Sequence, residues 1–169
     1  MSTLDLRSIK IRSGEQWRDT REVDLQPLEL GGQRYLAAPE HPEADLTISR
    51  TTSGLLFELA FESRLYGPCF RCLTETSVVS QIRGREYQAA SPDDSGELET
   101  PYVVDDKLDL SAWARDAVVL SLPDKILCRT DCAGLCTVCG RDLNVEPHEH
   151  EETVEDPRWA ALAELKERL

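Results

Sequence analysis

Apolar and polar residues alternate through the first half of the chain, and this pattern predicts β-strands. The clearest strand has apolar side chains on one face and glutamates on the other. The apolar positions are Leu55, Phe57, Leu59 and Phe61, and the glutamates are Glu58 and Glu62. A period of two is typical of a sheet that buries only one face. Residues 77–87 have the composition of a returning strand, so we expect a long antiparallel hairpin with Cys69 and Cys72 at its tip.

Shorter alternations precede this hairpin and predict further strands of the same sheet. Val23 and Leu25 alternate with polar neighbours, and Leu46 and Ile48 do the same later in the chain. A turn is expected at Gly31-Gly32, because glycine adopts turn conformations without steric cost.

A helical period replaces the alternation after residue 108. Trp113, Ala117 and Leu120 recur at helical spacing, Ser111 has the chemistry of an N-cap, and Pro123 ends the pattern. A second helix is predicted over residues 156–169, which start with an Asp-Pro pair and carry an apolar stripe expected to dock on the sheet.

These elements predict a single α+β domain over residues 1–169. The expected parts are a β-rich half with an antiparallel sheet and a long hairpin (1–87), an acidic loop (88–108), one packed helix (109–123), a Cys-rich zinc-knuckle segment (128–150) and a C-terminal helix (156–169).

The net charge of the chain limits the kinds of macromolecule that it can bind. The chain has 19 Lys and Arg against 32 Asp and Glu, which gives a net charge of -13. A broad basic face for nucleic acid is therefore excluded, and a basic partner is favoured. No apolar run is long enough to span a bilayer, and the first residues do not resemble a secretory signal. We expect a cytoplasmic protein whose thiols stay reduced, where closely spaced cysteines indicate a metal site more often than disulfides.

The cysteines and two of the histidines provide eight candidate metal ligands. They are Cys69, Cys72, Cys128, Cys132, Cys136, Cys139, His148 and His150. Zn²⁺ prefers four such ligands in a tetrahedron, and a Cys-x2-Cys pair followed by glycine wraps a metal in a tight turn. The interpretation without a metal at the histidines is a solvated acidic segment.

Two groupings of these ligands are compatible with the spacing. The favoured one joins Cys69 and Cys72 to Cys128 and Cys132, and leaves a second site made of Cys136, Cys139, His148 and His150. The rival is a single zinc-ribbon site shared by the pairs 69/72 and 136/139, with Cys128 and Cys132 free. One or two zinc ions are therefore expected.

Several of these motifs together resemble the YceD-like family, whose members are named for large ribosomal RNA subunit accumulation. The resemblance rests on Cys69-Phe-Arg-Cys72-Leu73, Leu120-Ser-Leu-Pro123, Cys128-x3-Cys132-Ala-Gly-Leu-Cys136-x2-Cys139-Gly140-Arg-Asp-Leu143-Asn144 and Asp156-Pro157-Arg158, and covers about residues 55–169. Asp5-Leu6-Arg7 fits the family's usual opening. Family members often end the motif with Cys-x-Cys where this chain has His148-Glu-His150, a change that keeps ligand chemistry.

The resemblance implies a role in accumulation or maturation of large-subunit (23S) ribosomal RNA. We therefore expect a non-enzymatic ribosome-biogenesis factor that contacts a ribosomal protein or pre-ribosomal particle. Cationic residues near the cysteines offer a local contact to rRNA, and neither DNA nor a membrane is expected as a partner.

Two other classes of protein also use clustered cysteines. A redox-sensitive zinc or thiol switch is the alternative, but a thioredoxin-type pair needs a helix after its first cysteine, and residues 73–79 read as a strand. A zinc enzyme is disfavoured because the chain lacks the usual motifs of zinc hydrolases and deaminases.

Overall fold

The computed structural model describes residues 2–90 and 99–150, and the chain divides into two compact units, 1–132 and 133–169. All regular elements of the described part lie in the first unit. They are β1 (Thr3–Asp5), a 3₁₀ turn (Leu6–Ser8), β2 (Gln16–Glu22), β3 (Leu28–Leu30), β4 (Gln33–Ala37), β5 (Glu43–Arg50), β6 (Gly54–Pro68), β7 (Glu75–Ala89), β8 (Val103–Val104), β9 (Lys107–Asp109) and α1 (Leu110–Ser121).

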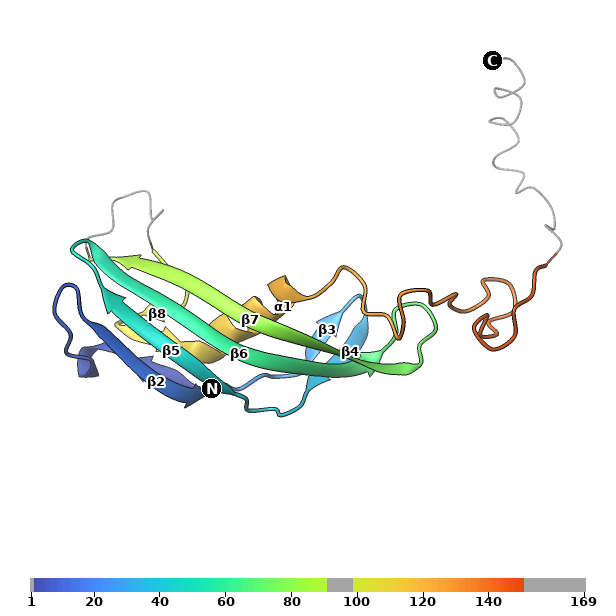
Figure 1. Cartoon of the computed structure of the whole chain (residues 1–169), viewed down its shortest axis with the longest axis horizontal. Coiled ribbons are helices and arrows are strands. Elements are labelled where there is room, and N and C mark those ends of the chain that lie inside the picture. Colours follow the sequence, from blue (N-terminus) through green and yellow to red (C-terminus); the bar gives the residue numbers. More distant parts are fainter. Residues whose placement is uncertain (1, 91–98, 151–169) are drawn as a thin grey trace, which may run out of the picture. The chain divides into compact units, whose positions relative to one another are not determined.

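The main sheet is antiparallel and is built around the predicted hairpin, β6–β7 (Figure 1). Its two strands are 15 residues long and pair without a break from Gly54↔Ala89 to Pro68↔Glu75. Strand β7 occupies one edge of β6. The other edge is shared by β5, which pairs with residues 55–60, and β4, which pairs with Leu65 and Tyr66. Outermost on that side are β2, next to β5, and β3, next to β4.

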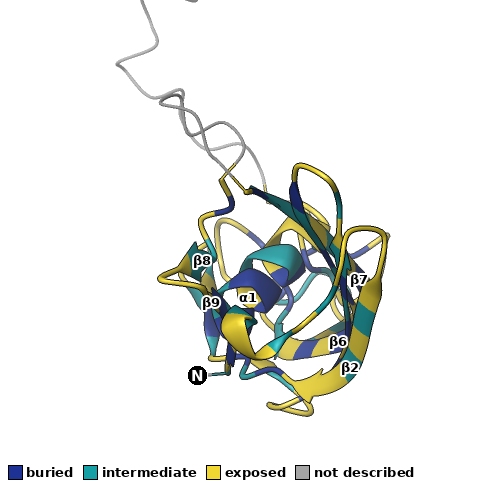
Figure 2. Cartoon of the chain, turned by 90° about the vertical axis from the view of Figure 1, so that its left-hand side faces the viewer, coloured by how far each residue is buried: buried dark blue, intermediate teal, exposed yellow. Residues whose placement is uncertain are grey.

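The core lies between the inner face of this sheet and helix α1 (Figure 2). Phe57, Leu59 and Leu65 of β6 are almost fully buried, as the period of two predicts. Helix α1 packs over β7 at Gly84: a Cβ atom placed on this glycine would lie 2.9 Å from the Trp113 indole nitrogen. Glycine is therefore what allows the large ring to approach the sheet closely.

A second, three-stranded sheet ties the start of the chain to the start of α1. Strand β9 lies between β1 and β8, with Leu4 opposite Leu108. The segment expected to be an acidic loop, 88–108, thus contains the end of β7, all of β8 and most of β9. The reason is that Leu108 is fully buried in the core, so the acidic residues around it do not make the whole segment solvated.

Helix α1 exists as predicted, but its cap and its buried face differ from the prediction. Asp109, not Ser111, is the N-cap, and its carboxylate accepts the Ala112 N–H at 3.0 Å. Ser111 is buried and accepts the Ser2 N–H at 2.8 Å. Leu120, expected on the core stripe, is 86% exposed, because the helix is rotated so that Trp113, Ala114 and Val118 face the core.

Two other sequence expectations meet different outcomes. Val23 and Leu25 are buried, but they follow β2 in an irregular segment whose N–H groups bond to the Pro42 and Glu40 carbonyls.

The predicted C-terminal helix (156–169) lies outside the described residues. Within the described part, no helix combines the length and the apolar character that crossing a bilayer requires.

Candidate metal centre

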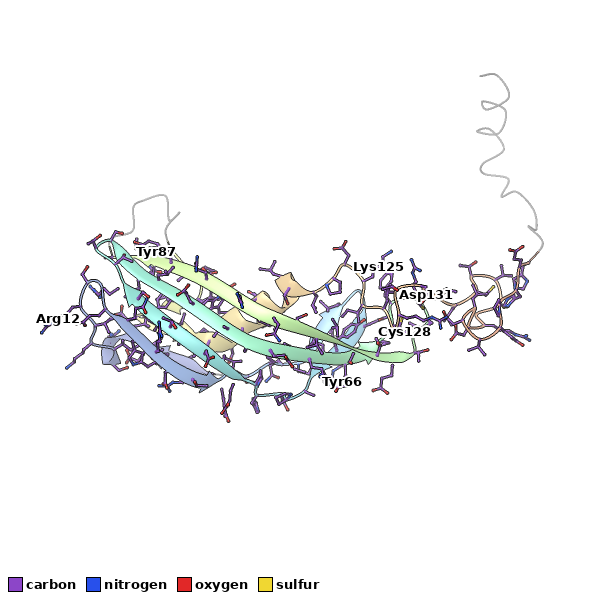
Figure 3. All side chains as sticks on the ribbon, viewed as in Figure 1. Arg12, Tyr66, Tyr87, Lys125, Cys128 and Asp131 are labelled. Atoms are coloured by element: carbon purple, nitrogen blue, oxygen red, sulfur yellow. The ribbon has the colours of Figure 1, made fainter. Side chains whose placement is uncertain are left out.

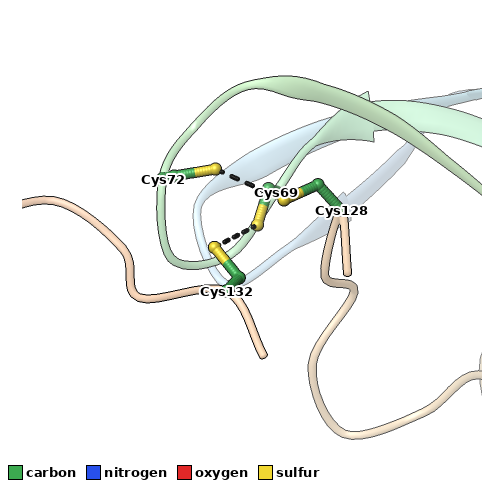
Figure 4. Close-up of side chains that lie close together, drawn as sticks. All are labelled: Cys69, Cys72, Cys128 and Cys132. Carbon is green, nitrogen blue, oxygen red and sulfur yellow. Dashed lines mark hydrogen bonds between the residues drawn. The ribbon is translucent and has the colours of Figure 1, made fainter. Parts of the chain in front are cut away.

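The tip of the β6–β7 hairpin forms a tight turn around Cys69 and Cys72. The Leu73 N–H donates to the Cys69 carbonyl at 3.0 Å, and Leu73 has a φ of 60°. A left-handed backbone is costly for leucine, so the turn is held by its surroundings rather than by local preference. The sulfur atoms of Cys69 and Cys72 both point toward those of Cys128 and Cys132 (Figure 4).

Cys128 and Cys132 complete the first cluster from the segment that follows α1. The Cys69 sulfur lies 3.8 Å from that of Cys132, and the Cys72 sulfur lies 3.6 Å from that of Cys128 (Figure 4). All four sulfurs lie within 4.8 Å of one another. Four thiolates bound to zinc at about 2.3 Å in a tetrahedron would be about 3.8 Å apart. The donor atoms and their spacing therefore fit a structural zinc site.

Main-chain and side-chain contacts hold the two segments together around these sulfurs. The Phe70 N–H donates to the Ile126 carbonyl at 2.8 Å, and the Arg71 guanidinium donates to the Cys132 carbonyl at 2.7 Å. Cys69 and Cys132 are fully buried, whereas Cys128 lies at the surface. Figure 3 places Cys128 and Lys125 at the same end of the β6–β7 hairpin, with Tyr87 at the opposite end. The cluster thus joins the far end of the hairpin to the chain that leaves α1.

The surroundings of the first cluster shift the pKa values of two of its thiols in opposite directions. Burial disfavours the Cys69 thiolate, but N–H groups of Cys72, Cys128 and Arg71 outweigh burial and lower the pKa of Cys69 to about 6. Partial desolvation of the Cys128 sulfur, together with hydrogen bonds to neighbouring cysteines, raises the pKa of Cys128 to about 12. Four thiols this close repel one another once ionised, and a divalent cation at their centre would remove that repulsion.

The second cluster lies in the second unit and starts with a turn of the same geometry. The Gly140 N–H donates to the Cys136 carbonyl at 2.8 Å, and Gly140 has a φ of 73°. The Cys136 N–H donates to the Arg141 carbonyl, and Leu135 and Asp142 form a β-bridge that closes a small hairpin. Here the left-handed position is occupied by glycine, which carries little conformational cost.

His148 and His150 bring imidazole nitrogens to this turn. The His148 Nε2 atom lies 3.1 Å from the Cys139 sulfur, and all four donor atoms of Cys136, Cys139, His148 and His150 lie within 4.8 Å of one another. The His148 Nδ1 atom is 2.7 Å from the Glu146 carbonyl, so Nδ1 carries the proton that is donated there. This bond, together with the nearby Cys136 sulfur, raises the pKa of His148. The free Nε2 lone pair then faces the cysteines, as metal-binding histidines require.

The pKa of one thiol in the second cluster is also shifted. The backbone N–H groups of Cys139 and Val138 lower the pKa of Cys136 to about 6. Cys136 is buried, whereas Cys139 and His150 are exposed. A Cys₂His₂ set of this kind fits zinc in its donor chemistry, although it is more open to solvent than the first cluster.

The structure groups the eight residues as the favoured sequence interpretation expected. Cys128 and Cys132 lie with the hairpin tip, so the rival grouping, which left them free, is wrong. Sequence reasoning did not find the groups that orient the ligands, namely the Ile126 and Glu146 carbonyls and the Arg71 guanidinium. A backbone carbonyl has no sequence signature, and an arginine beside cysteines resembles any surface cation.

Fold and site together define a class of protein: a mostly antiparallel β-protein with one packed helix and two Cys/His clusters suited to metal binding. The chain belongs to the YceD family, described as large ribosomal RNA subunit accumulation protein YceD, whose pattern it matches over residues 57–166. The matched region starts in β6 and includes all eight candidate ligands.

Bacterial relatives agree with this assignment. An uncharacterized protein of Mycobacterium tuberculosis is 38% identical over 128 residues, which cover 73% of this chain and 61% of the relative. The uncharacterized protein YlbN of Bacillus subtilis is 26% identical over 111 residues, or 64% of each chain. The chain thus spans about three-fifths of the length of the mycobacterial relative. No solved structure matches it.

Proposed function

We propose that this protein is a zinc-stabilised, non-enzymatic factor that supports accumulation of large-subunit (23S) ribosomal RNA in the cytoplasm. The family description supports the link to ribosomal RNA. The observation that carries the structural part is the convergence of four cysteine sulfurs from two segments about 60 residues apart in sequence. In this proposal, Cys69, Cys72, Cys128 and Cys132 hold one zinc ion, and Cys136, Cys139, His148 and His150 hold a second.

Zinc would act here by stabilising the fold. When bound, it supplies folding free energy, because a site of this kind does not exist in the unfolded chain. The first cluster fixes the hairpin tip to the segment after α1, and the second orders a short segment that has no helix or strand of its own among its described residues. Both sets supply four protein ligands, whereas a catalytic zinc keeps a position open for water. Four-ligand sites favour a structural role.

Charge supports a protein or ribonucleoprotein partner for this acidic chain. The cations near the cysteines already have local contacts: Arg71 donates to the Cys132 carbonyl, Arg129 pairs with Asp131, and Arg141 pairs with Glu146. Lys125 lies over the Phe70 ring, 5.2 Å from its centroid. Exposed pairs of this kind neutralise few phosphates, so we propose contact with a basic ribosomal protein or a pre-ribosomal particle, with rRNA touched only locally.

Metal analysis of the purified protein tests the structural half of the proposal. Elemental analysis should find two zinc ions per chain, one in a Cys132→Ser variant and one in a Cys139→Ser variant. A Ser77→Ala variant, at an exposed position in β7, is the matched control and should keep both ions. A metal-free protein with the cysteines paired as disulfides would instead support the redox-switch alternative.

Complementation tests the functional half. In a host strain that lacks its own family member, the wild-type chain should restore the ratio of 23S to 16S rRNA, and the Cys132→Ser variant should restore it less because the variant is less stable. Full restoration by a Cys132→Ser protein that binds one zinc would show that rRNA accumulation does not need the first cluster. An unchanged ratio with the wild-type chain, expressed and zinc-loaded, would refute the role in rRNA accumulation.

A further inference from the structure

Strand β7 has a long edge that no other described strand pairs with. Among the described residues, β6 is the only strand that pairs with β7, and the pairing covers all 15 residues of both strands. In Figure 1, β7 forms the border of the main sheet, with α1 behind it. Long regular edges of this kind present main-chain donors and acceptors to a further strand, and proteins usually blunt them.

Hydrogen bonds at the two ends of the hairpin show which residues present this edge. The Cys69 N–H bonds to the Thr74 carbonyl, and the Ala90 N–H bonds to the Ser53 carbonyl, each at 2.8 Å. In an antiparallel ladder, bonded and non-bonded pairs alternate. Even-numbered residues of β7 therefore bond to β6. The N–H and C=O groups of odd-numbered residues from Glu75 to Tyr87 point away from β6, toward the free edge.

The side chains of the odd-numbered residues from Glu75 to Arg85 are exposed, and those from Glu75 to Arg83 are self-complementary. From Glu75 to Arg83 they are Glu75, Ser77, Val79, Gln81 and Arg83. In an antiparallel pair of two such strands centred on Val79, Glu75 faces Arg83 at both ends and Val79 faces its own copy. Neither Glu75 nor Arg83 has an ion-pair partner among the described residues, whereas Arg85 is bound to Glu58 at 2.6 Å.

We propose that two copies of this chain associate through the free edges of β7, antiparallel and centred on Val79, to form a two-fold symmetric dimer. A two-fold axis at Val79 gives a closed interface in which each contact occurs twice. Every facing pair of odd-numbered residues exchanges two main-chain hydrogen bonds. The exposed valine, 47% accessible in the single chain, becomes covered by its counterpart.

The groove beside this edge supports the same arrangement. A cavity of about 360 Å³ lies between β7 and α1, lined by Gln81, Gly84, Trp113, Ala117 and Leu120 among others. Leu120, which is 86% exposed, and Gln81 line the same cavity. A second strand paired along β7 at Gln81 would lie next to this cavity and cover part of its lining.

The test is the oligomeric state of the full zinc-loaded chain, measured by analytical ultracentrifugation from about 1 to 100 μM. We expect a reversible monomer–dimer equilibrium. Val79→Pro should abolish the dimer, because proline removes an N–H that points to the free edge and does not bond to β6. Val79→Thr, which keeps this N–H, is the matched control and should still dimerise. Thermal melting and zinc content would verify that both variants are folded.

Charge exchange tests the register. Glu75→Arg and Arg83→Glu should each raise the dimer dissociation constant about tenfold, since each places two like-charged pairs opposite one another. The double variant should restore wild-type affinity. A chain that stays monomeric at 100 μM, or a folded Val79→Pro variant that dimerises normally, would overturn the proposal. Failure of the double variant to recover would overturn the register. The oligomeric state is a different readout from zinc content and rRNA levels, so failure of this proposal can be told apart from failure of the proposed function.

Discussion

Replacing Gly67 with alanine should destabilise the protein, because no room exists for the added methyl group. Gly67 lies near the end of β6, where the ring of Tyr35 packs directly on it. A Cβ atom at this position would lie 2.7 Å from Cε1 and 2.9 Å from Cγ of that ring, well inside van der Waals contact. Tyr35 is only 3% exposed, and its hydroxyl donates to the Pro68 carbonyl at 2.8 Å. The ring therefore has to move within a packed region.

Three contributions set the size of the effect. Forcing a methyl group into a packed site costs roughly 1–3 kcal/mol. Displacing the ring weakens the bond from Tyr35 to Pro68, a loss of about 1 kcal/mol. Alanine also restricts the unfolded chain, which returns about 0.5–1 kcal/mol. The net expectation is a destabilisation of about 2 kcal/mol, or a fall in Tm of roughly 4–8 °C for a chain of this length.

Thermal denaturation of the zinc-loaded protein, followed by circular dichroism, measures this shift. The informative control is the same substitution in a Tyr35→Leu background. Without the aromatic ring the methyl group has space, so Gly67→Ala should raise Tm there by about 1–2 °C through its effect on the unfolded chain. A neutral or higher Tm for Gly67→Ala in the wild-type background would show that the ring does not pack on this glycine in solution.

The remaining predictions concern the second cluster and the partner. Gly140→Ala should weaken zinc binding at the second cluster about fivefold, measured by competition with a chromogenic chelator, because alanine at a φ of 73° costs about 1 kcal/mol while its methyl group meets no atom within 4 Å. Glu149→Gln should leave zinc content, Tm and rRNA levels unchanged; loss of function in a folded, zinc-loaded variant would indicate catalysis. Generic single-stranded RNA should bind weakly at physiological salt in fluorescence anisotropy, and tight binding would contradict the protein-partner proposal.

The hairpin was predictable from sequence because it follows from a strong local rule, whereas the spacing of the cysteines left two groupings open and only favoured the one that the structure shows. A strict period of two over Leu55 to Phe61 has few other structural solutions. The favoured grouping rested on the position of Cys69 and Cys72 at the tip of the strands that the pattern defines, and on the lack of further candidate ligands close in sequence to Cys128 and Cys132 other than the pair 136/139. Gly140 directly follows a Cys-x2-Cys pair, and a glycine at this position predicts the positive φ that the structure shows.

The features that could not be predicted from the sequence are those that depend on tertiary packing. The spacing of Trp113, Ala117 and Leu120 is compatible with several rotations of a helix, and the small Gly84 fixed the actual one by admitting the Trp113 ring. The sequence also gives no sign that Leu73 adopts a left-handed backbone, because this conformation is unfavourable for leucine. The turn around Cys69 and Cys72 imposes it.

The long separation between the two halves of the first cluster has a consequence for synthesis of the chain. On a translating ribosome, Cys69 and Cys72 emerge well before Cys132, and two thiolates alone bind zinc weakly. All the described strands and all of α1 must therefore emerge before the four sulfurs can meet. A cross-link spanning about 60 residues restricts the unfolded chain by about 4 kcal/mol, and this restriction is absent until the last cysteine arrives. In the proposed zinc-bound protein, metal loading at this site is accordingly a late event, which can occur only in a chain already complete through α1.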